Sequence, residues 1–241
     1  MIFSSNKKVD VGWFVYDDFA HKSFDQDFIP INKNTFSCPA VGSLNNKLFE
    51  VLPLFDLDVS FGVDSNDEPY FKYSINTKKT PTTDNIHNLI KDRLSVRKDN
   101  FGHVVLQLSD TKILVSDNKD LIATVLQPQN NVIKANCTFV SGEFKIYGWL
   151  RPLNAAYVQI DKTKECKISF KADEGFYSVM FSDPINLKEI EPNDKILKYL
   201  NRTYGISLFQ KQLSRVYPKI LKKRPKKLLS YSYHFRPYRS L

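Results

Sequence analysis

Between residues 101 and 183 the chain alternates short apolar blocks with short polar breaks. The blocks hold about five to nine residues each and are rich in Val, Ile, Phe, Tyr and Thr, and Asp, Asn, Lys, Gly or Pro separate them. β-Branched and aromatic residues suit the pleated surface of a strand, and this spacing is typical of sheets built from short strands. The pattern therefore predicts a mainly β protein, and more specifically an antiparallel β-sandwich or jelly-roll-like body.

The N-terminal part of the chain carries the same kind of signal. Residues 9–16 predict a first strand, and apolar residues alternate with acidic ones within the stretch 48–63. Turn-forming residues follow at 64–69, so the stretch 70–75 is predicted to return as the second strand of a hairpin. Pro53 has no amide hydrogen to donate, which indicates an edge position or a bend within the stretch that contains it.

Polar clusters predict where the later strands end. Residues 109–111, 117–120 and 140–143 have the composition of turns between antiparallel strands. Arg151 and Pro152 interrupt another apolar block, because proline cannot donate to a sheet ladder. These positions divide the region into the strands of the predicted body.

Three segments have helical rather than strand signals. Thr83 or Asp84 can cap a first helix, which we expect to pack on one sheet. Pro192 and Asn193 are start signals for a second helix, and a capping box at Ser207 predicts a third. The apolar residues at helical spacing are Ile86, Leu89, Ile90 and Leu94, then Ile196, Leu197 and Leu200, then Phe209, Leu213 and Val216.

The net charge of +9 hides an asymmetry along the chain. Residues 195–241 carry thirteen Lys or Arg and no acidic residue, whereas residues 1–194 carry twenty-two basic and twenty-six acidic ones, a net charge of −4. We therefore divide the chain into a β body at 1–192, two short helices at 193–217 and a basic aromatic arm at 218–241. Charge asymmetry of this kind favours a partner for the arm.

The arm combines cations with aromatic rings, and two classes of partner fit that mixture. Aromatic side chains can fill pockets on a neighbouring subunit, of this or another protein, while cations meet its acidic rim. Cations can equally bind phosphates while aromatic rings stack on nucleic-acid bases. A purely solvated tail is the third alternative, which the hydrated aromatic rings disfavour. The candidate partner- or nucleic-acid-binding residues are Lys219, Lys222, Lys223, Arg224, Lys226, Lys227, Tyr231, Tyr233, Phe235, Arg236, Tyr238 and Arg239.

The sequence contains no motif of a known catalytic or metal-binding type. It has no G-x-S-x-G, no G-x-x-x-x-G-K-[ST], no G-x-G-x-x-G and no His-x-Asp/Glu, and its three cysteines are far apart. We therefore predict no catalytic residue, no metal and no cofactor, and favour a non-enzymatic protein. Trp149 and Arg151 are a candidate ligand-stacking patch, the alternative being a core Trp at a strand end with Arg151 on the rim. Without a secretory signal or an apolar block of membrane-spanning length, a cytosolic protein with no membrane contact is expected.

Aromatic, Gly and Pro landmarks follow one another in a fixed order through the predicted body: Phe101, Gly102, Pro128, Asn130, Phe139, Phe144, Trp149, Phe170, Lys171, Glu174 and Phe181. This order resembles an uncharacterised family of β-rich proteins from tailed phages of marine cyanobacteria and from marine bacteria. The resemblance covers about residues 35–192, leaves the arm outside it and implies a phage-encoded protein in the virion or the host cytoplasm. Together with the arm it favours a structural or assembly protein. A nucleic-acid-binding accessory protein, and a jelly-roll enzyme or small-ligand-binding protein, are the alternatives.

Overall fold

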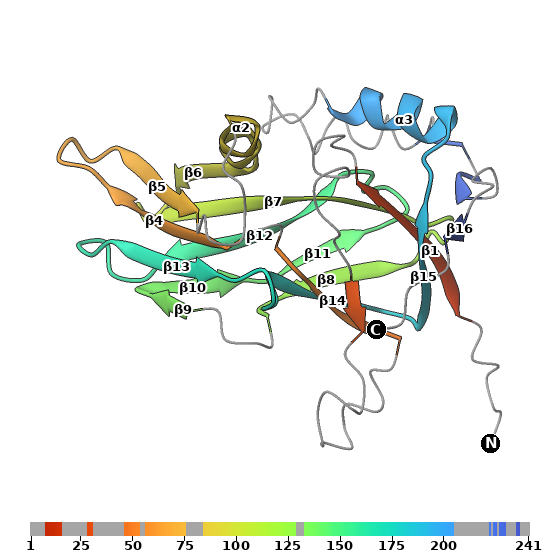
Figure 1. The fold of residues 1–241 in the computed structure, drawn as a ribbon, viewed down its shortest axis with the longest axis horizontal. Helices are drawn as coiled ribbons and strands as arrows, with labels where there is room; N and C mark the ends of the chain where they lie inside the picture. The colour runs from red at the N-terminus through yellow and green to blue at the C-terminus, as the bar shows by residue number, and fades with distance from the viewer. Residues whose placement is uncertain are drawn as a thin grey trace, which may run out of the picture.

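The computed structural model shows a mainly β protein, which confirms the mainly β character predicted from the sequence (Figure 1). In the part of the chain that the structure describes, the strands form three sheets and two α-helices, α2 and α3, accompany them. The described residues are 8–15, 28–30, 46–53, 56–75, 84–128, 133–204, 222, 224–225, 227–229 and 235–236.

The largest sheet has seven strands, in the order β10-β12-β7-β1-β15-β16, and β6 pairs with β7 beside this path. β1 and β15 run parallel, whereas the other pairs of this sheet are antiparallel. The strands are β1 Val9–Val15, β6 Leu94–Lys98, β7 Val104–Val115, β10 Cys137–Val140, β12 Pro152–Gln159, β15 Ile185–Ile190 and β16 Phe235–Arg236.

Two smaller antiparallel sheets complete the body. The five-stranded sheet has the order β11-β8-β14-β3-β2, and the four-stranded sheet has the order β5-β4-β13-β9. The strands of the five-stranded sheet are β2 Phe28–Pro30, β3 Leu48–Val51, β8 Ile122–Leu126, β11 Gly142–Lys145 and β14 Tyr177–Phe181. Those of the four-stranded sheet are β4 Leu57–Val63, β5 Pro69–Ile75, β9 Ile133–Ala135 and β13 Cys166–Phe170.

β7 connects the two halves of the seven-stranded sheet. The sequence predicts a turn at residues 109–111, and this prediction is wrong, because β7 runs through these residues as one strand of 12 residues. Its first half pairs with β6, its second half pairs with β1, and β12 pairs along its other edge. Leu106 and Leu114 face the same core, so the strand alternation continues through Asp110 and Lys112, whose side chains are also buried.

The stretch 133–145 passes through all three sheets. β9 belongs to the four-stranded sheet, β10 to the seven-stranded sheet and β11 to the five-stranded sheet. Asn136 lies between β9 and β10 with a φ of 61°, in the left-handed region that Asn tolerates. The turn predicted at residues 140–143 is therefore wrong as a hairpin, because β10 and β11 pair with distant strands of different sheets.

The stretch 48–63 forms two strands in two sheets rather than one. β3 ends before Pro53 and β4 begins after it, which confirms the bend predicted at this proline. The predicted hairpin is also confirmed, because β4 and β5 pair along their whole length. Asp64 closes the turn between them, since its amide donates to the carbonyl oxygen of Glu68 at 2.9 Å.

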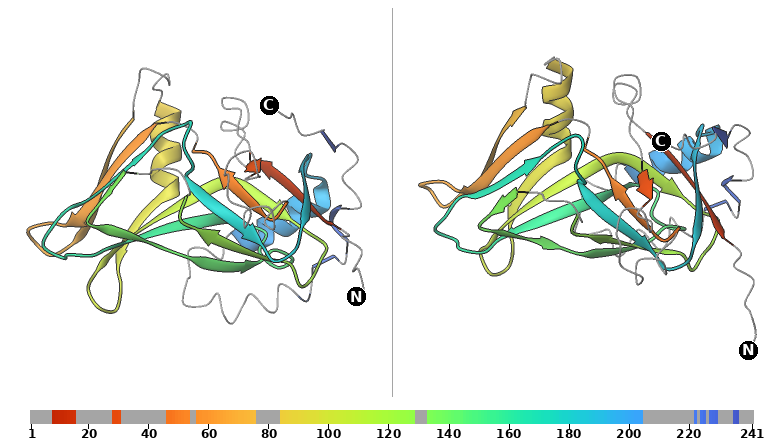
Figure 2. Two further views of the ribbon diagram at one scale, coloured as in Figure 1. Left: turned by 90° about the horizontal axis from the view of Figure 1, so that it is seen from below. Right: turned by 60° about the horizontal axis from the view of Figure 1, so that its bottom comes forward.

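The two described helices lie toward opposite ends of the body, α2 beside β4, β5 and β6 and α3 beside β1 and β15 (Figures 1 and 2). α2 spans Asp84–Arg93 and α3 spans Asp194–Tyr204, so both of these predicted helices are confirmed. The carboxamide oxygen of Asn193 caps α3, because it accepts hydrogen bonds from the amides of Lys195 and Ile196 at 2.9 and 3.0 Å. The third helix, predicted from Ser207, lies outside the described residues.

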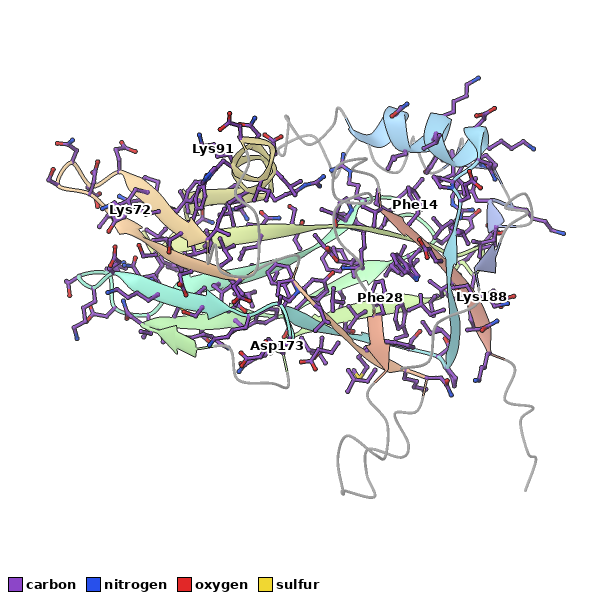
Figure 3. All side chains as sticks on the ribbon, viewed as in Figure 1. Phe14, Phe28, Lys72, Lys91, Asp173 and Lys188 are labelled. Atoms are coloured by element: carbon purple, nitrogen blue, oxygen red, sulfur yellow. The ribbon has the colours of Figure 1, made fainter. Side chains whose placement is uncertain are left out.

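The seven-stranded sheet buries apolar side chains on both of its faces. On one face they join the side chains of the two smaller sheets and of α2 in one large core, in which Phe28 lies. On the other face a second core forms beneath α3, and Phe14 of β1 points into it (Figure 3). This second core contains Phe14, Ile113, Val115, Leu150, Ile190, Ile196, Tyr199, Leu200 and Leu228.

Candidate functional site

Residues of the C-terminal arm dock on the body beside the end of β7. The guanidinium of Arg224 donates to the carbonyl oxygen of Ser116 at 2.7 Å and to the Asp117 carboxylate at 3.3 Å. The same guanidinium lies 3.8 Å from the centre of the Tyr147 ring, within the range of a cation–π contact. The Arg224 side chain is 1% exposed, so its charge is buried among these partners.

Asp117 also holds the backbone of the arm. Its two carboxylate oxygens accept hydrogen bonds from the amides of Leu228 and Leu229, at 2.7 and 3.0 Å. Leu228 is fully buried in the core beneath α3. Asp117 therefore receives hydrogen bonds from three residues of the arm, and hydrogen bonds to a charged group are among the stronger ones in proteins.

Two further parts of the arm, β16 and Leu229, also contact the body. β16 pairs with β15 in antiparallel fashion, with Arg236 opposite Glu189. A Cβ atom placed on Gly12 would lie 2.6 Å from Ile190 and 2.8 Å from Leu229, so the absence of a side chain at this glycine lets both pack closely. We call Gly12, Ser116, Asp117, Tyr147 and β15 the arm-docking site.

The structure changes the interpretation of the predicted arm residues. Arg224, one of the candidates for a partner or nucleic-acid contact, has its side chain buried against its own body in this structure. Lys222 and Lys227 are exposed, and the backbones of Phe235 and Arg236 form β16. The remaining candidates, Lys219, Lys223, Lys226, Tyr231, Tyr233, Tyr238 and Arg239, lie outside the described residues.

The candidate ligand patch belongs to the packed interior. The indole nitrogen of Trp149 donates to the carbonyl oxygen of Pro152 at 3.2 Å, and its ring centre lies 4.8 Å from that of Phe144. Trp149 is partly buried against the main core, as the alternative of a core Trp at a strand end expects. Arg151 is 9% exposed and so lies within the structure rather than on its rim.

Sequence reasoning missed a buried polar cluster between β7 and β14. The hydroxyl of Tyr177 donates to the Asp110 carboxylate at 2.7 Å, and the Lys112 ammonium lies 3.7 Å from the same carboxylate. The Lys112 ammonium also lies 5.8 Å from the centre of the Phe28 ring. Burial, and then the adjacent Asp110 charge, raise the pKa of Tyr177 well above its usual value. The cluster therefore holds a protonated phenol as a fixed hydrogen-bond donor.

A cavity of about 60 Å³ lies beside this cluster. Leu, Ile and Phe side chains line most of it, and Arg93, Asp110 and Thr111 supply polar groups. The Arg93 guanidinium donates to the carbonyl oxygen of Asp110 at 3.2 Å. Pockets for drug-sized ligands usually exceed about 300 Å³, whereas a cavity of this size suits a few ordered waters. Its chemistry fits a structural polar cluster better than a substrate site.

The loop between β6 and β7 presents an aromatic ring to solvent. Phe101 is 79% exposed, and Ile160, which follows β12, is 60% exposed. The Asp99 carboxylate accepts hydrogen bonds from the amides of Phe101 and His103, at 2.8 and 2.9 Å, and Lys162 donates to the carbonyl oxygen of Phe101. Burial alone would raise the pKa of Asp99, but the hydrogen bonds from these amides lower it. These hydrogen bonds therefore order the backbone of the loop although its largest side chain, Phe101, is exposed.

Two cysteines meet where the seven-stranded and four-stranded sheets join. Cys137 and Cys166 are both free thiols and both buried. The Cys166 thiol donates to the carbonyl oxygen of Asn136 at 3.1 Å. Hydrogen bonding between the two sulfur groups lowers the pKa of Cys137 and raises the pKa of Cys166. The Cys137 sulfur is therefore the one that more readily becomes a thiolate.

Comparison of the chain with protein-family models, with curated proteins and with solved structures gave no match. Among the described residues, no group of three or more His, Cys, Asp or Glu side chains could hold a metal ion. No helix in that part of the chain is long and apolar enough to cross a membrane. The basis for a function is therefore the arm-docking site and the exposed loop.

Proposed function

We propose that this chain is a non-enzymatic structural or assembly protein of a tailed phage, whose β body packs on partner proteins and whose C-terminal arm ties neighbouring subunits together. The phage origin is supported by the order of sequence landmarks between Phe101 and Phe181. A sandwich or jelly-roll body is supported by the single core that the three sheets share. Such a protein acts in the virion, or in the host cytoplasm before assembly.

The observation that carries this proposal is the arm-docking site. The side chains of Arg224 and Leu228 are buried against the body. The Asp117 carboxylate accepts hydrogen bonds from the Arg224 guanidinium and the Leu228 amide. Residues 1–194 have a net charge of −4, and the arm at 218–241 carries eight Lys or Arg and no acidic residue, so the arm of one copy is attracted to residues 1–194 of another. Linking two subunits through the arm requires a complementary site on the body, and the arm-docking site supplies one.

The exposed loop supports packing on partner proteins. Large aromatic side chains are the usual anchors of protein interfaces. Because Asp99 and Lys162 already order the Phe101 loop, little conformational freedom is lost when that ring is buried by a partner. Ile160 is a second large apolar side chain exposed at the surface.

Light scattering of the full chain across concentration and salt series tests the proposal. We expect a mass above the 28.0 kDa of one chain that rises with concentration. Because salt screens the attraction between arm and body, the mass should fall as salt is added. A mass of one chain at every concentration and every salt would remove self-assembly from the proposal.

Nucleic-acid binding through the arm is a second candidate, supported by the exposed side chains of Lys222 and Lys227 on the docked segment. Binding of a fluorescent single-stranded oligonucleotide would then weaken with salt, by about 0.7 log unit of affinity per phosphate contact for each log unit of salt. Replacing both lysines by alanine should reduce that slope. No binding at low salt would remove this candidate while leaving the assembly function in place.

A further inference from the structure

The connection between the body and the docked arm is much longer than docking requires. Residues 205–221 join Tyr204, the last residue of α3, to the docked segment. Covalent geometry lets a fully extended stretch of that length span at most about 55 Å, and the helix predicted from Ser207 would shorten this span. α3 is only about 16 Å long, and Leu228 packs directly beneath it. The same segment can therefore reach a docking site well beyond its own body.

We propose that Arg224, Leu228, Leu229 and β16 of one copy dock on the arm-docking site of a second copy, in a reciprocal exchange of arms. This inference rests on the proposed function and names a second copy of the chain as the partner. Arg224 of each chain then donates to Asp117 of the other and lies over its Tyr147 ring. Leu228 of each chain fills the core beneath the other chain's α3.

Exchange conserves the contacts of the docked arm. The same hydrogen bonds at Asp117 and the same burial of Leu228 are made whether the arm docks on its own body or on a second one. The balance between the two forms is then set by protein concentration and by the reach of the connection. The opposite charges of body and arm favour the approach of two copies and weaken with salt.

Two substitutions in the full chain weaken opposite sides of the contact between the arm and the arm-docking site. Asp117→Asn weakens the docking site and leaves the arm intact, whereas Arg224→Ala weakens the arm and leaves the site intact. In either variant, the contact between the arm and the arm-docking site is weakened, both within one chain and between two identical copies. When the two chains are mixed, however, the intact arm of the first meets the intact site of the second. Exchange therefore predicts that the mixture associates more strongly than either variant alone.

The experiment measures the mass of each variant and of their equimolar mixture by light scattering, at matched total concentration. The mixture should approach twice the 28.0 kDa of one chain at concentrations where each variant alone is largely monomeric. Distinct dyes on the two variants should give energy transfer only in the mixture. Asp120→Asn and Lys119→Ala are matched controls, because they remove exposed charges from the loop that holds Asp117. A mixture of these two controls should behave like the unaltered chain.

The outcomes separate the exchange from the proposed function. If the variants and their mixture all assemble as the unaltered chain does, subunits associate through another surface, and the exchange is wrong while assembly stands. If the unaltered chain assembles, the variants do not and the mixture shows no gain, the arm acts only on its own body and the exchange is again wrong. If the unaltered chain never associates, self-assembly itself fails. Circular dichroism and the fluorescence of buried Trp13 confirm that each variant is folded.

Discussion

The hydroxyl of Tyr177 on β14 donates a hydrogen bond of 2.7 Å to the carboxylate of Asp110 on β7, across the interior of the body. The two residues belong to different sheets, so the bond joins the five-stranded sheet to the seven-stranded one. Lys112 lies 3.7 Å from the same carboxylate and is 1% exposed. A carboxylate this deeply buried depends on its partners, because water cannot replace them.

Tyr177→Phe should therefore lower the free energy of unfolding by about 1–3 kcal/mol, since it removes one donor from the buried Asp110 carboxylate, which also accepts from the Thr111 amide at 2.6 Å. Urea denaturation measures this loss. Tyr157→Phe is the matched control, because the buried Tyr157 hydroxyl has no hydrogen-bond partner in the described structure. Its removal should cost little or stabilise the protein. Equal losses in the two variants would show that the bond to Asp110 contributes nothing.

Stability should fall at alkaline pH, and Tyr177 should account for part of the fall. Its pKa in the folded protein is raised by burial and by Asp110, whereas a tyrosine in the unfolded chain titrates near about pH 10. Above that pH the unfolded chain binds fewer protons than the folded one, so the free energy of unfolding decreases as pH rises. The contribution is fully present below pH 10. Denaturation between about pH 9 and 11 should show a shallower decline for Tyr177→Phe.

Lys112→Met should destabilise the protein by about 3 kcal/mol, because it leaves the buried Asp110 carboxylate without its cation. Asp110→Asn combined with Lys112→Met should cost less than the sum of the two single changes, since neither charge then remains buried without the other. Denaturant midpoints of the four proteins measure this coupling. Additive losses would mean that the two side chains act independently.

Gly12→Ala should loosen the docked arm. A Cβ atom at this position would lie 2.6 Å from the Ile190 side chain and 2.8 Å from that of Leu229, so both side chains must move and the packing of Leu229 is disturbed, at a cost of about 1–2 kcal/mol. Trypsin should then cut after Lys222 and Lys227 sooner than in the unaltered chain. At Gly62 the nearest atoms lie 3.7 Å away, an ordinary contact, so Gly62→Ala should leave that cleavage rate unchanged. Unchanged cleavage in Gly12→Ala would mean that the arm does not depend on this close approach.

Cys137 should react with iodoacetamide before Cys166. Interaction with the Cys166 side chain lowers the pKa of Cys137, while Cys166 is 0% exposed against 9% for Cys137. Mass spectrometry of tryptic peptides gives the order of modification. Cys166→Ala should raise the pKa of Cys137 and shift its reaction to higher pH. An unchanged pH dependence in that variant would show that the two thiols do not interact.

Local signals in the sequence predicted several elements correctly. Helical spacing of Ile86, Leu89 and Ile90 and the cap at Asn193 are properties of single segments, and both helices formed where these signals stand. The hairpin of β4 and β5 was likewise predicted from a turn and its two flanking strands. In each case the decisive contacts are made between residues close in the sequence.

The candidate site was harder to predict, because its contacts are long-range. Ser109, Asp110 and Thr111 have turn composition, and only Tyr177, 67 residues away, makes Asp110 a buried strand residue. The even-numbered apolar positions on either side of Asp110 were the available signal, since a turn would have broken their alternation.

The sequence by itself determined the mainly β character of the chain, its two described helices and the charge contrast between body and arm. Each of these follows from residue type and local spacing. Only the tertiary structure decided that Asp110 and Lys112 lie inside and that Arg224 docks on its own body. Asp117 holds Leu228 from 111 residues away, and the energy of such a bond depends on which distant groups meet and whether water is excluded from them.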